Sequence, residues 1–102
     1  PTQLLRIYKL KDEIKSKYLE QEIYIKFNKN LKVLEKNLKN TESVHFDFNI
    51  FKFTYTYSNE NNALYEKISI INSKKNYNHV YRAPYDIDRI ISDRIKWILE
   101  RI

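Results

Sequence analysis

The sequence predicts an α+β fold in a single domain over residues 1–102, with a helix at each end and an antiparallel sheet between them. Two observations indicate this order. Apolar residues recur every three or four positions near both ends of the chain, as they do in amphipathic helices. In the middle, apolar and polar residues alternate, as they do in strands with one buried face. We therefore divide the chain into a basic helical arm at 1–40, a β-meander at 44–82 and a helix at 85–102.

The N-terminal segment carries two apolar stripes. The first consists of Leu4, Ile7, Leu10, Ile14 and Tyr18, and the second of Leu19, Ile23, Phe27, Leu31, Leu34 and Leu38. On a helix the two stripes lie nearly opposite each other. We favour a helix through most of 3–39, with a break near 20–30 as the alternative, because the letters EIYIKF alternate like a strand. A helix with two apolar faces also predicts that one of them joins a second copy, which makes the protein a homodimer.

The stretch VHFDFNIFKFTYTYS, from Val44 to Ser58, begins the meander and holds six aromatic rings in fifteen residues. Its apolar row changes phase between Ile50 and Phe51, which we expect to require a β-bulge or a sharp bend. The Asn-rich turn SNENN leads into a second strand, ALYEKISIIN, and the turn SKKNYN then leads into a short third strand, HVYR. The sequence therefore predicts a three-stranded antiparallel meander with one apolar and one polar face.

The six rings have two possible uses. Exposed rings can stack on the bases of a single-stranded nucleic acid. Rings that alternate with polar residues more often fill the core beneath a half-buried strand. We expect Phe46, Phe48, Phe51 and Phe53 to fill the core and leave the positions of the two following tyrosines open.

The C-terminal segment is predicted to be an amphipathic helix that packs on the apolar face of the sheet. Asp86 is a suitable N-cap, because Pro84 precedes it and an apolar stripe follows. That stripe consists of Ile87, Ile90, Ile91, Ile95, Ile98, Leu99 and Ile102.

The composition excludes several classes of function. The chain has no Gly and no Cys, so phosphate-binding glycine loops, dinucleotide fingerprints, nucleophile elbows and thiolate chemistry are all excluded. No apolar run reaches the length of about 18 residues that a membrane span needs. We expect a cytoplasmic protein that is not an enzyme and uses no cofactor or metal. The abundance of Lys, Asn, Ile, Tyr and Phe suggests AT-rich coding, as in a phage or a mobile element.

One arrangement of side chains could support catalysis. His45 and Asp47 would share one face of a strand, and His79 could approach them. Such a trio could hold a metal or move a proton, but two histidines in a chain of this length are a weak signal. We therefore assign no catalytic and no metal-binding residues.

The charge points to a binding role. The formal net charge is +6, and residues 1–40 hold ten basic against five acidic side chains. A basic arm suits a polyanion. A polar sheet face with Lys52, Thr54, Thr56, Lys67 and Ser69 is more typical of a solvated surface. The candidate binding residues are Lys74, Lys75, Tyr77, His79, Tyr81 and Arg82 around the last turn, and Lys26, Lys29, Lys32, Lys36 and Lys39 along the helical arm.

From these features we expect a small binding protein that contacts nucleic acid or a nucleoprotein. The alternative is an inhibitor or adaptor whose basic surface meets an acidic protein partner, such as a host enzyme or a defence complex.

Overall fold

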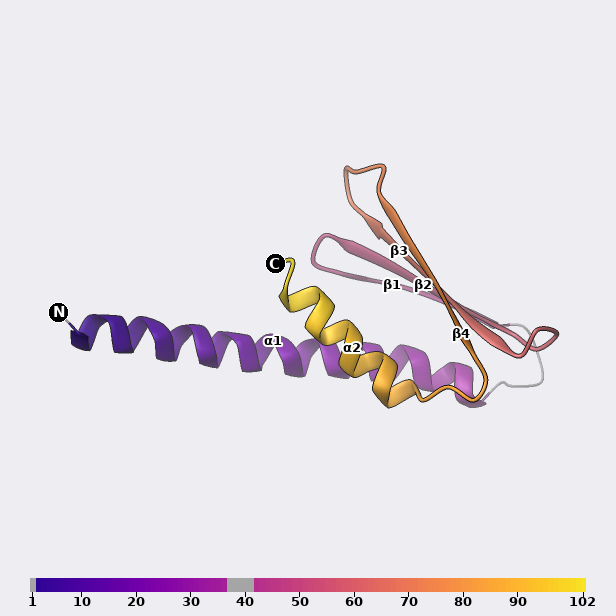
Figure 1. Cartoon of the computed structure of the whole chain (residues 1–102), viewed down its shortest axis with the longest axis horizontal. Coiled ribbons are helices and arrows are strands. Elements are labelled where there is room, and N and C mark those ends of the chain that lie inside the picture. Colours follow the sequence, from indigo (N-terminus) through magenta and orange to yellow (C-terminus); the bar gives the residue numbers. More distant parts are fainter. Residues whose placement is uncertain (1, 37–41) are drawn as a thin grey trace.

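The computed structural model describes the backbone of residues 2–36 and 42–102, and the side chains from residue 15 onward within those ranges. Two helices lie on one face of an antiparallel sheet (Figure 1). The elements follow in the order α1 (Thr2–Lys36), β1 (Glu42–Phe48), β2 (Phe51–Ser58), β3 (Ala63–Ile70), β4 (Asn76–Arg82) and α2 (Ile87–Leu99). The sheet is a meander in which each strand pairs with the next. The predicted α+β architecture is confirmed.

The sheet has four strands where the sequence predicted three. The phase change after Ile50 is a tight hairpin turn, because Phe48 pairs directly with Phe51 across it. Asn49 occupies this turn with φ 56°, and its Oδ1 accepts a hydrogen bond of 2.7 Å from the backbone N–H of Ile50. The expectation of a bulge or bend within one strand was wrong. A two-residue turn between antiparallel strands brings both apolar rows to the same face.

The turns of this glycine-free chain use asparagine. Asn49, Asn62 and Asn72 have φ values of 56°, 50° and 63°, and each lies in a turn between successive strands. Among residues with a Cβ atom, asparagine enters the left-handed region with comparatively little strain. The meander can therefore close its hairpins without glycine.

The first helix is continuous, so the alternative with a break near 20–30 was wrong. Ile23, Phe27, Leu31 and Leu34 recur at helical spacing and are all buried. Ile25, which completed the strand-like alternation with Ile23 and Phe27, lies on the outer side of the helix and is exposed, as is Tyr24. The first apolar stripe falls largely on residues whose side chains are outside the described part. Its last member, Tyr18, is 60% exposed, and the N-terminal part of α1 extends beyond the body of the molecule (Figure 1).

The core lies between the sheet and the two helices. Phe27 of α1 stands at its centre, with its ring centroid 4.8 Å from that of Phe46 and 4.8 Å from that of Phe53. Phe51 is also buried and Phe48 is partly buried against the same cluster, so the prediction that these four rings fill the core is confirmed. Tyr55 and Tyr57, which the sequence left open, belong to the core as well.

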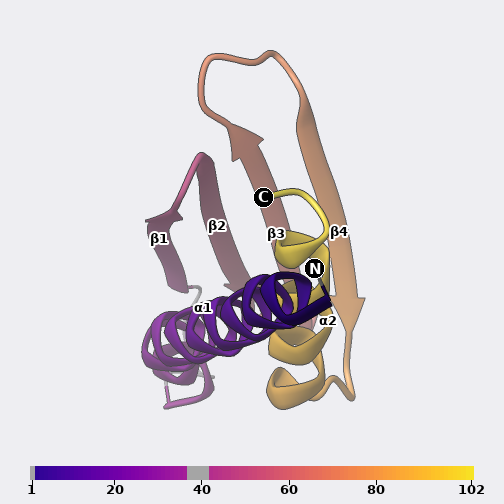
Figure 2. The same ribbon diagram turned by 90° about the vertical axis from the view of Figure 1, so that its left-hand side faces the viewer.

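The second helix closes the core over β3 and β4. The Asp86 side chain accepts a hydrogen bond of 3.0 Å from the Asp88 backbone N–H, as predicted for the N-cap. Trp97 packs edge-on against Phe51 of β2, with centroids 5.1 Å apart, and against Tyr77 of β4, with centroids 5.3 Å apart. These contacts place α2 in front of the sheet next to β4, with α1 crossing beside it (Figure 2).

Candidate nucleic-acid interface

The register of the sheet sorts its side chains onto two faces. Tyr55 pairs with Glu66, and Glu66 pairs with His79, so these residues share the face that the helices cover. The residues between them point to the other side, because side chains alternate along a strand. No element of the described chain lies over that second face, which we call the open face.

The covered face contains a buried charge pair. Glu66 and Arg94 of α2 are 3% and 8% exposed. The Arg94 Nε donates to Glu66 Oε2 at 3.0 Å, and its Nη2 donates to Glu66 Oε1. The Tyr55 hydroxyl donates to Glu66 Oε2, and the Tyr81 hydroxyl donates to Glu66 Oε1 at 3.3 Å. The carboxylate is therefore surrounded by donors from β2, β4 and α2, as a buried charge requires.

The network shifts the ionisation of the groups around it. Burial, reinforced by the neighbouring Glu66 carboxylate, raises the pKa of Tyr55 well above its ordinary value. The same two causes raise the pKa of Tyr81. Burial alone would lower the pKa of Arg94, but the Glu66 carboxylate and the two tyrosines outweigh it and the pKa is raised. Both phenols stay neutral and Arg94 stays charged at neutral pH, so all three can donate hydrogen bonds to the Glu66 carboxylate. The network thereby joins the edge strand β4 to α2.

The open face is polar and carries small hydroxyl and amide groups. Its strand residues include Ser43, His45 and Asp47 from β1, Lys52, Thr54 and Thr56 from β2, Tyr65, Lys67 and Ser69 from β3, and Asn76, Asn78, Val80 and Arg82 from β4. Cross-strand hydrogen bonds join Ser43 to Thr56 at 2.9 Å and His45 to Thr54 at 3.1 Å. These bonds order the hydroxyl groups across the surface.

Unpaired lysines add positive charge to this face. Lys52 and Lys67 are exposed, and neither forms an ion pair within the described chain. Lys52 lies opposite Ser69, two residues along β3 from Lys67, so the two lysines are diagonal neighbours with Cα atoms about 7–8 Å apart. Asp47 is the one carboxylate among the described strand residues of this face. It lies directly opposite Lys52 in the β1–β2 register, so it offsets part of the charge of Lys52 although the two form no ion pair. The open face still keeps a net positive charge, because Lys67 and Arg82 have no acidic residue opposite them in the sheet.

Lys74 and Lys75 extend this positive surface at one end. Both are exposed in the turn between β3 and β4, directly before Asn76. Asn76 pairs with Ser69, which in turn pairs with Lys52. The β3–β4 hairpin also reaches past the β1–β2 hairpin, so its tip stands free of the rest of the sheet (Figure 2).

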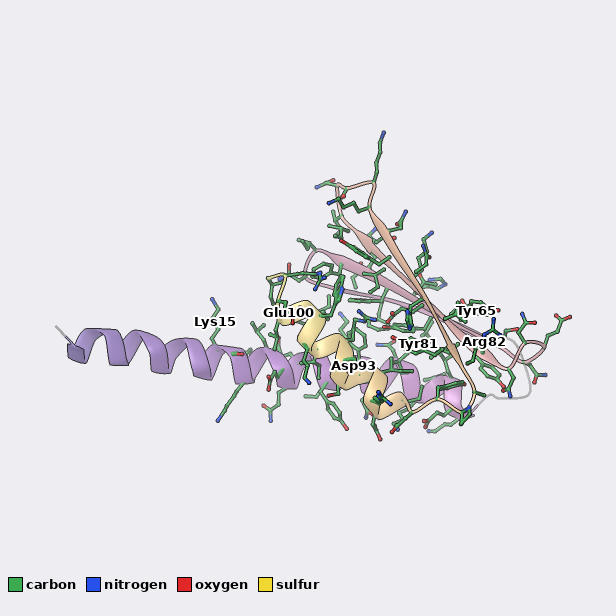
Figure 3. All side chains as sticks on the ribbon, in the orientation of Figure 1. Lys15, Tyr65, Tyr81, Arg82, Asp93 and Glu100 are labelled. Atoms are coloured by element: carbon green, nitrogen blue, oxygen red, sulfur yellow. The ribbon has the colours of Figure 1, made fainter. Side chains whose placement is uncertain are left out.

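The predicted cluster from Lys74 to Arg82 does not form one surface. Tyr77 and Tyr81 lie on the covered face, one against Trp97 and the other in the Glu66 network. His79 lies on that face too, with its ring centroid 4.4 Å from that of Tyr81. Arg82 lies on the open side, at the opposite end of β4 from the lysines. Figure 3 shows it near Tyr65. Strand alternation separates the tyrosines and the histidine from the basic residues.

The lysines predicted along the helical arm are only partly available. Lys32 contacts Glu35 and Asp88, each at 3.5 Å, so two carboxylates already compensate it. Lys26, Lys29 and Lys36 are exposed and form no ion pair within the described chain. Lys39 lies outside the described residues. The arm therefore offers a shorter run of free lysines than its sequence suggested.

A cleft of about 450 Å³ lies between β4 and the start of α2. Its lining includes Arg82 and Arg89, but also Asp86 and Asp93. Two positive and two negative side chains cancel in net charge, so this cleft favours an anion less than the open face does.

The trio that could support catalysis is not assembled. His45 and Asp47 lie on the open face, whereas His79 lies on the covered face of the same sheet. Within the described ranges, no three His, Cys, Asp or Glu residues are grouped so that they could hold a metal ion.

The buried pair was missed from the sequence, although a signal was present. Glu66 occupies an apolar-row position between Leu64 and Ile68, and Arg94 occupies an apolar-stripe position between Ile91 and Ile98. Opposite charges on two apolar faces that must meet are typical of a buried ion pair.

Neither described helix combines the length and the apolar character that a membrane crossing needs. Comparison with protein-family models, with curated proteins and with solved structures finds no match to this chain. Its function is therefore inferred from the geometry and charge of its own surfaces.

Proposed function

We propose that this chain is a non-catalytic nucleic-acid-binding protein whose open sheet face contacts the phosphate backbone. The observation that carries the proposal is a set of exposed lysines that form no ion pair with the described side chains: Lys52, Lys67, Lys74 and Lys75. Such lysines can bind phosphates without first giving up a carboxylate. The binding surface thus differs from the predicted one, because Tyr77, His79 and Tyr81 lie on the other face.

The surrounding groups support contacts to the backbone rather than to bases. Hydroxyl and amide side chains, such as those of Thr54, Ser69 and Asn76, donate hydrogen bonds to phosphate and sugar oxygens. The aromatic rings of β1 and β2 are in the core, so they cannot stack on bases. Tyr65 is the one tyrosine on the open side of the described strands. We therefore expect binding that depends strongly on salt and weakly on base sequence.

The test is a titration of fluorescent single- and double-stranded DNA and RNA across a salt series. A triple variant, Lys52→Gln, Lys67→Gln and Lys75→Gln, removes two charges from the open face and one from the turn at its end. We expect weaker binding at every salt concentration. The salt slope should also be less steep, by about 0.9 for each duplex phosphate that the variant no longer neutralises.

The matched control is the triple variant Lys26→Gln, Lys29→Gln and Lys36→Gln, which removes the same charge from α1. If the open face is the interface, this control binds almost like the wild type. An equal loss of affinity in both variants would mean that net charge alone drives binding, and a larger loss in the control would place the interface on the helical arm. No binding of the wild type at low salt would contradict the proposal and favour an acidic protein partner.

An origin in a phage or a mobile element, an inhibitory role and a cytoplasmic location stay predictions from composition. Capture of a host enzyme or a defence complex as the partner would support the inhibitory role.

A further inference from the structure

The outer edge of β4 lacks the features with which proteins usually protect an edge strand. Such edges carry lysine, proline, a bulge or a covering segment. From Asn76 to Tyr81 the strand has no charged residue and no proline, and its pairing with β3 is unbroken. Residues 76–80 are all exposed, and no described element lies beyond β4 (Figure 2). The other edge strand, β1, differs because it carries two carboxylates, Glu42 and Asp47.

The direction of the free backbone groups follows from one hydrogen bond. The Ala83 N–H donates to the Asn62 carbonyl at 3.3 Å, so it points toward β3. Hydrogen-bonded and non-hydrogen-bonded pairs alternate along an antiparallel ladder. Residues 77, 79 and 81 therefore also point their backbone groups toward β3. The N–H and C=O groups of 76, 78, 80 and 82 point outward, where no strand of the described chain pairs with them.

We propose that this edge binds the same edge of a second copy, with the two β4 strands antiparallel about a two-fold axis at His79. In this register Asn78 forms a hydrogen-bonded pair with Val80 of the partner subunit, and Asn76 forms one with Arg82 of the partner subunit. The symmetric pairs complete the set, so all four outward-facing residues are used. A two-fold axis at residue 78 or 80 would leave one end of the row without a partner.

The side chains suit this register. Tyr77 is 38% exposed and Val80 is 42% exposed, and both would be partly covered by the partner strand. No two charged residues of β4 stand opposite each other. Lys74 and Lys75 would lie beside residues 83–86 of the second copy, a segment that contains one acid and no basic residue. The edge is thus complementary to itself in its backbone groups, and no like charges stand directly opposite each other on β4.

Pairing at β4 would join two open faces into one continuous eight-stranded surface. The proposal does not rest on nucleic-acid binding, and its test is made without nucleic acid. It also differs from the homodimer expected from the sequence, which used an apolar stripe of the first helix.

The sharpest test uses one engineered cysteine, because the chain has none of its own. Residue 79 would lie opposite residue 79 of the second copy in a non-hydrogen-bonded pair, and the two Cα atoms in such a pair are about 4.5 Å apart. This separation falls within the range of about 4.4–6.8 Å that a disulfide tolerates. His79→Cys should therefore convert mostly to a linked dimer under mild oxidation.

The matched control is Asn76→Cys, on the same exposed strand. Residue 76 would oppose residue 82 of the second copy, so the two cysteines would be six residues out of register, or about 20 Å apart. We expect little linkage in this control. Equal linkage in the two variants, or none in either, would overturn the proposal.

A second measurement removes the interface without a cross-link. Asn78→Lys combined with Val80→Lys would place lysines opposite each other in two pairs, and edge lysines oppose strand pairing. Sedimentation should show a dimer for the wild type and a folded monomer for this variant. The control, Ser43→Lys with His45→Lys, adds the same charge to β1 and should remain a dimer. A monomeric wild type, or a dimer that persists in the β4 variant, would contradict the β4 pairing.

Discussion

The two faces of this sheet use charge in opposite ways. On the covered face, Glu66 and Arg94 are buried and hydrogen-bonded to each other and to two tyrosines. On the open face, Lys52 and Lys67 point to the opposite side of the sheet from that network, because side chains alternate along a strand. Neither has an ion-pair partner in the described chain. The comparison shows that strand parity decides whether a charged residue of β2 or β3 supports the structure or is available to a ligand.

The largest effect is expected for Glu66→Ala. It would leave the Arg94 guanidinium buried without its carboxylate, and breaking a buried pair costs about 3–5 kcal/mol. Urea unfolding followed by circular dichroism measures this loss. The control Glu60→Ala changes an exposed turn residue and should alter stability by less than about 0.5 kcal/mol. Similar small effects in both variants would show that the pair contributes little.

A double variant sharpens the same point. Glu66→Leu with Arg94→Leu removes both charges together, and such replacements are often neutral or stabilising. We expect it to recover most of the stability that Glu66→Ala loses. If the double variant is as unstable as the single one, the loss comes from packing or from the tyrosine hydrogen bonds rather than from an unpaired charge.

A smaller effect, which depends on pH, is expected for Tyr55→Phe. Removing the hydroxyl leaves a buried carboxylate oxygen with one donor fewer, at a cost of about 1–3 kcal/mol. Because burial and Glu66 raise the pKa of Tyr55, this residue contributes stability that is fully present below the unfolded-state pKa of about 10. That contribution is lost as the pH rises through the higher folded-state pKa.

Urea unfolding at neutral pH and above pH 10 measures this dependence. The wild type should lose stability more steeply than Tyr55→Phe over the alkaline range. Tyr65→Phe is the matched control, because its hydroxyl accepts a hydrogen bond from Asn61 at the exposed side of the sheet. Parallel alkaline curves for the wild type and Tyr55→Phe would contradict the assignment.

The smallest effect on stability is expected on the open face. Lys52→Gln with Lys67→Gln removes two solvated charges that have no ion-pair partner in the described chain, so unfolding free energy should change by less than about 0.5 kcal/mol. The same variant should weaken nucleic-acid binding. A large loss of stability would mean that these lysines have a structural role and would weaken the contrast between the two faces.

Local pattern was sufficient for much of the fold. The helical spacing of the buried residues from Ile23 to Leu34 in α1 and from Ile87 to Ile98 in α2, the Asp86 cap and the core positions of four phenylalanines were predicted correctly. Ile102, which the sequence placed in the C-terminal apolar stripe, lies beyond the end of α2 and is exposed. The fourth strand was missed because a phase change fits either a bulge or a two-residue turn, and the Asn49–Ile50 turn contains no glycine to mark it. Turn type depends on which residues pair across the turn, which a single strand pattern does not reveal.

The candidate site was less predictable from local pattern. The nine residues from Lys74 to Arg82 looked like one cluster because they are close in sequence. In the sheet they divide between a turn, two faces and two ends of β4. Lys52 and Lys67 are fifteen positions apart and become diagonal neighbours only when β2 pairs with β3.

By itself, the sequence determined the α+β order of helix, antiparallel sheet and helix, the classes of chemistry that a chain without Gly or Cys cannot perform, and the excess of positive charge. Only the tertiary structure decided which charges are paired, which face of the sheet is left open and which strand edge is free. The physical reason is that periodicity is a local property of the backbone. Burial and ion pairing depend on contacts between residues far apart in the chain, such as Glu66 and Arg94.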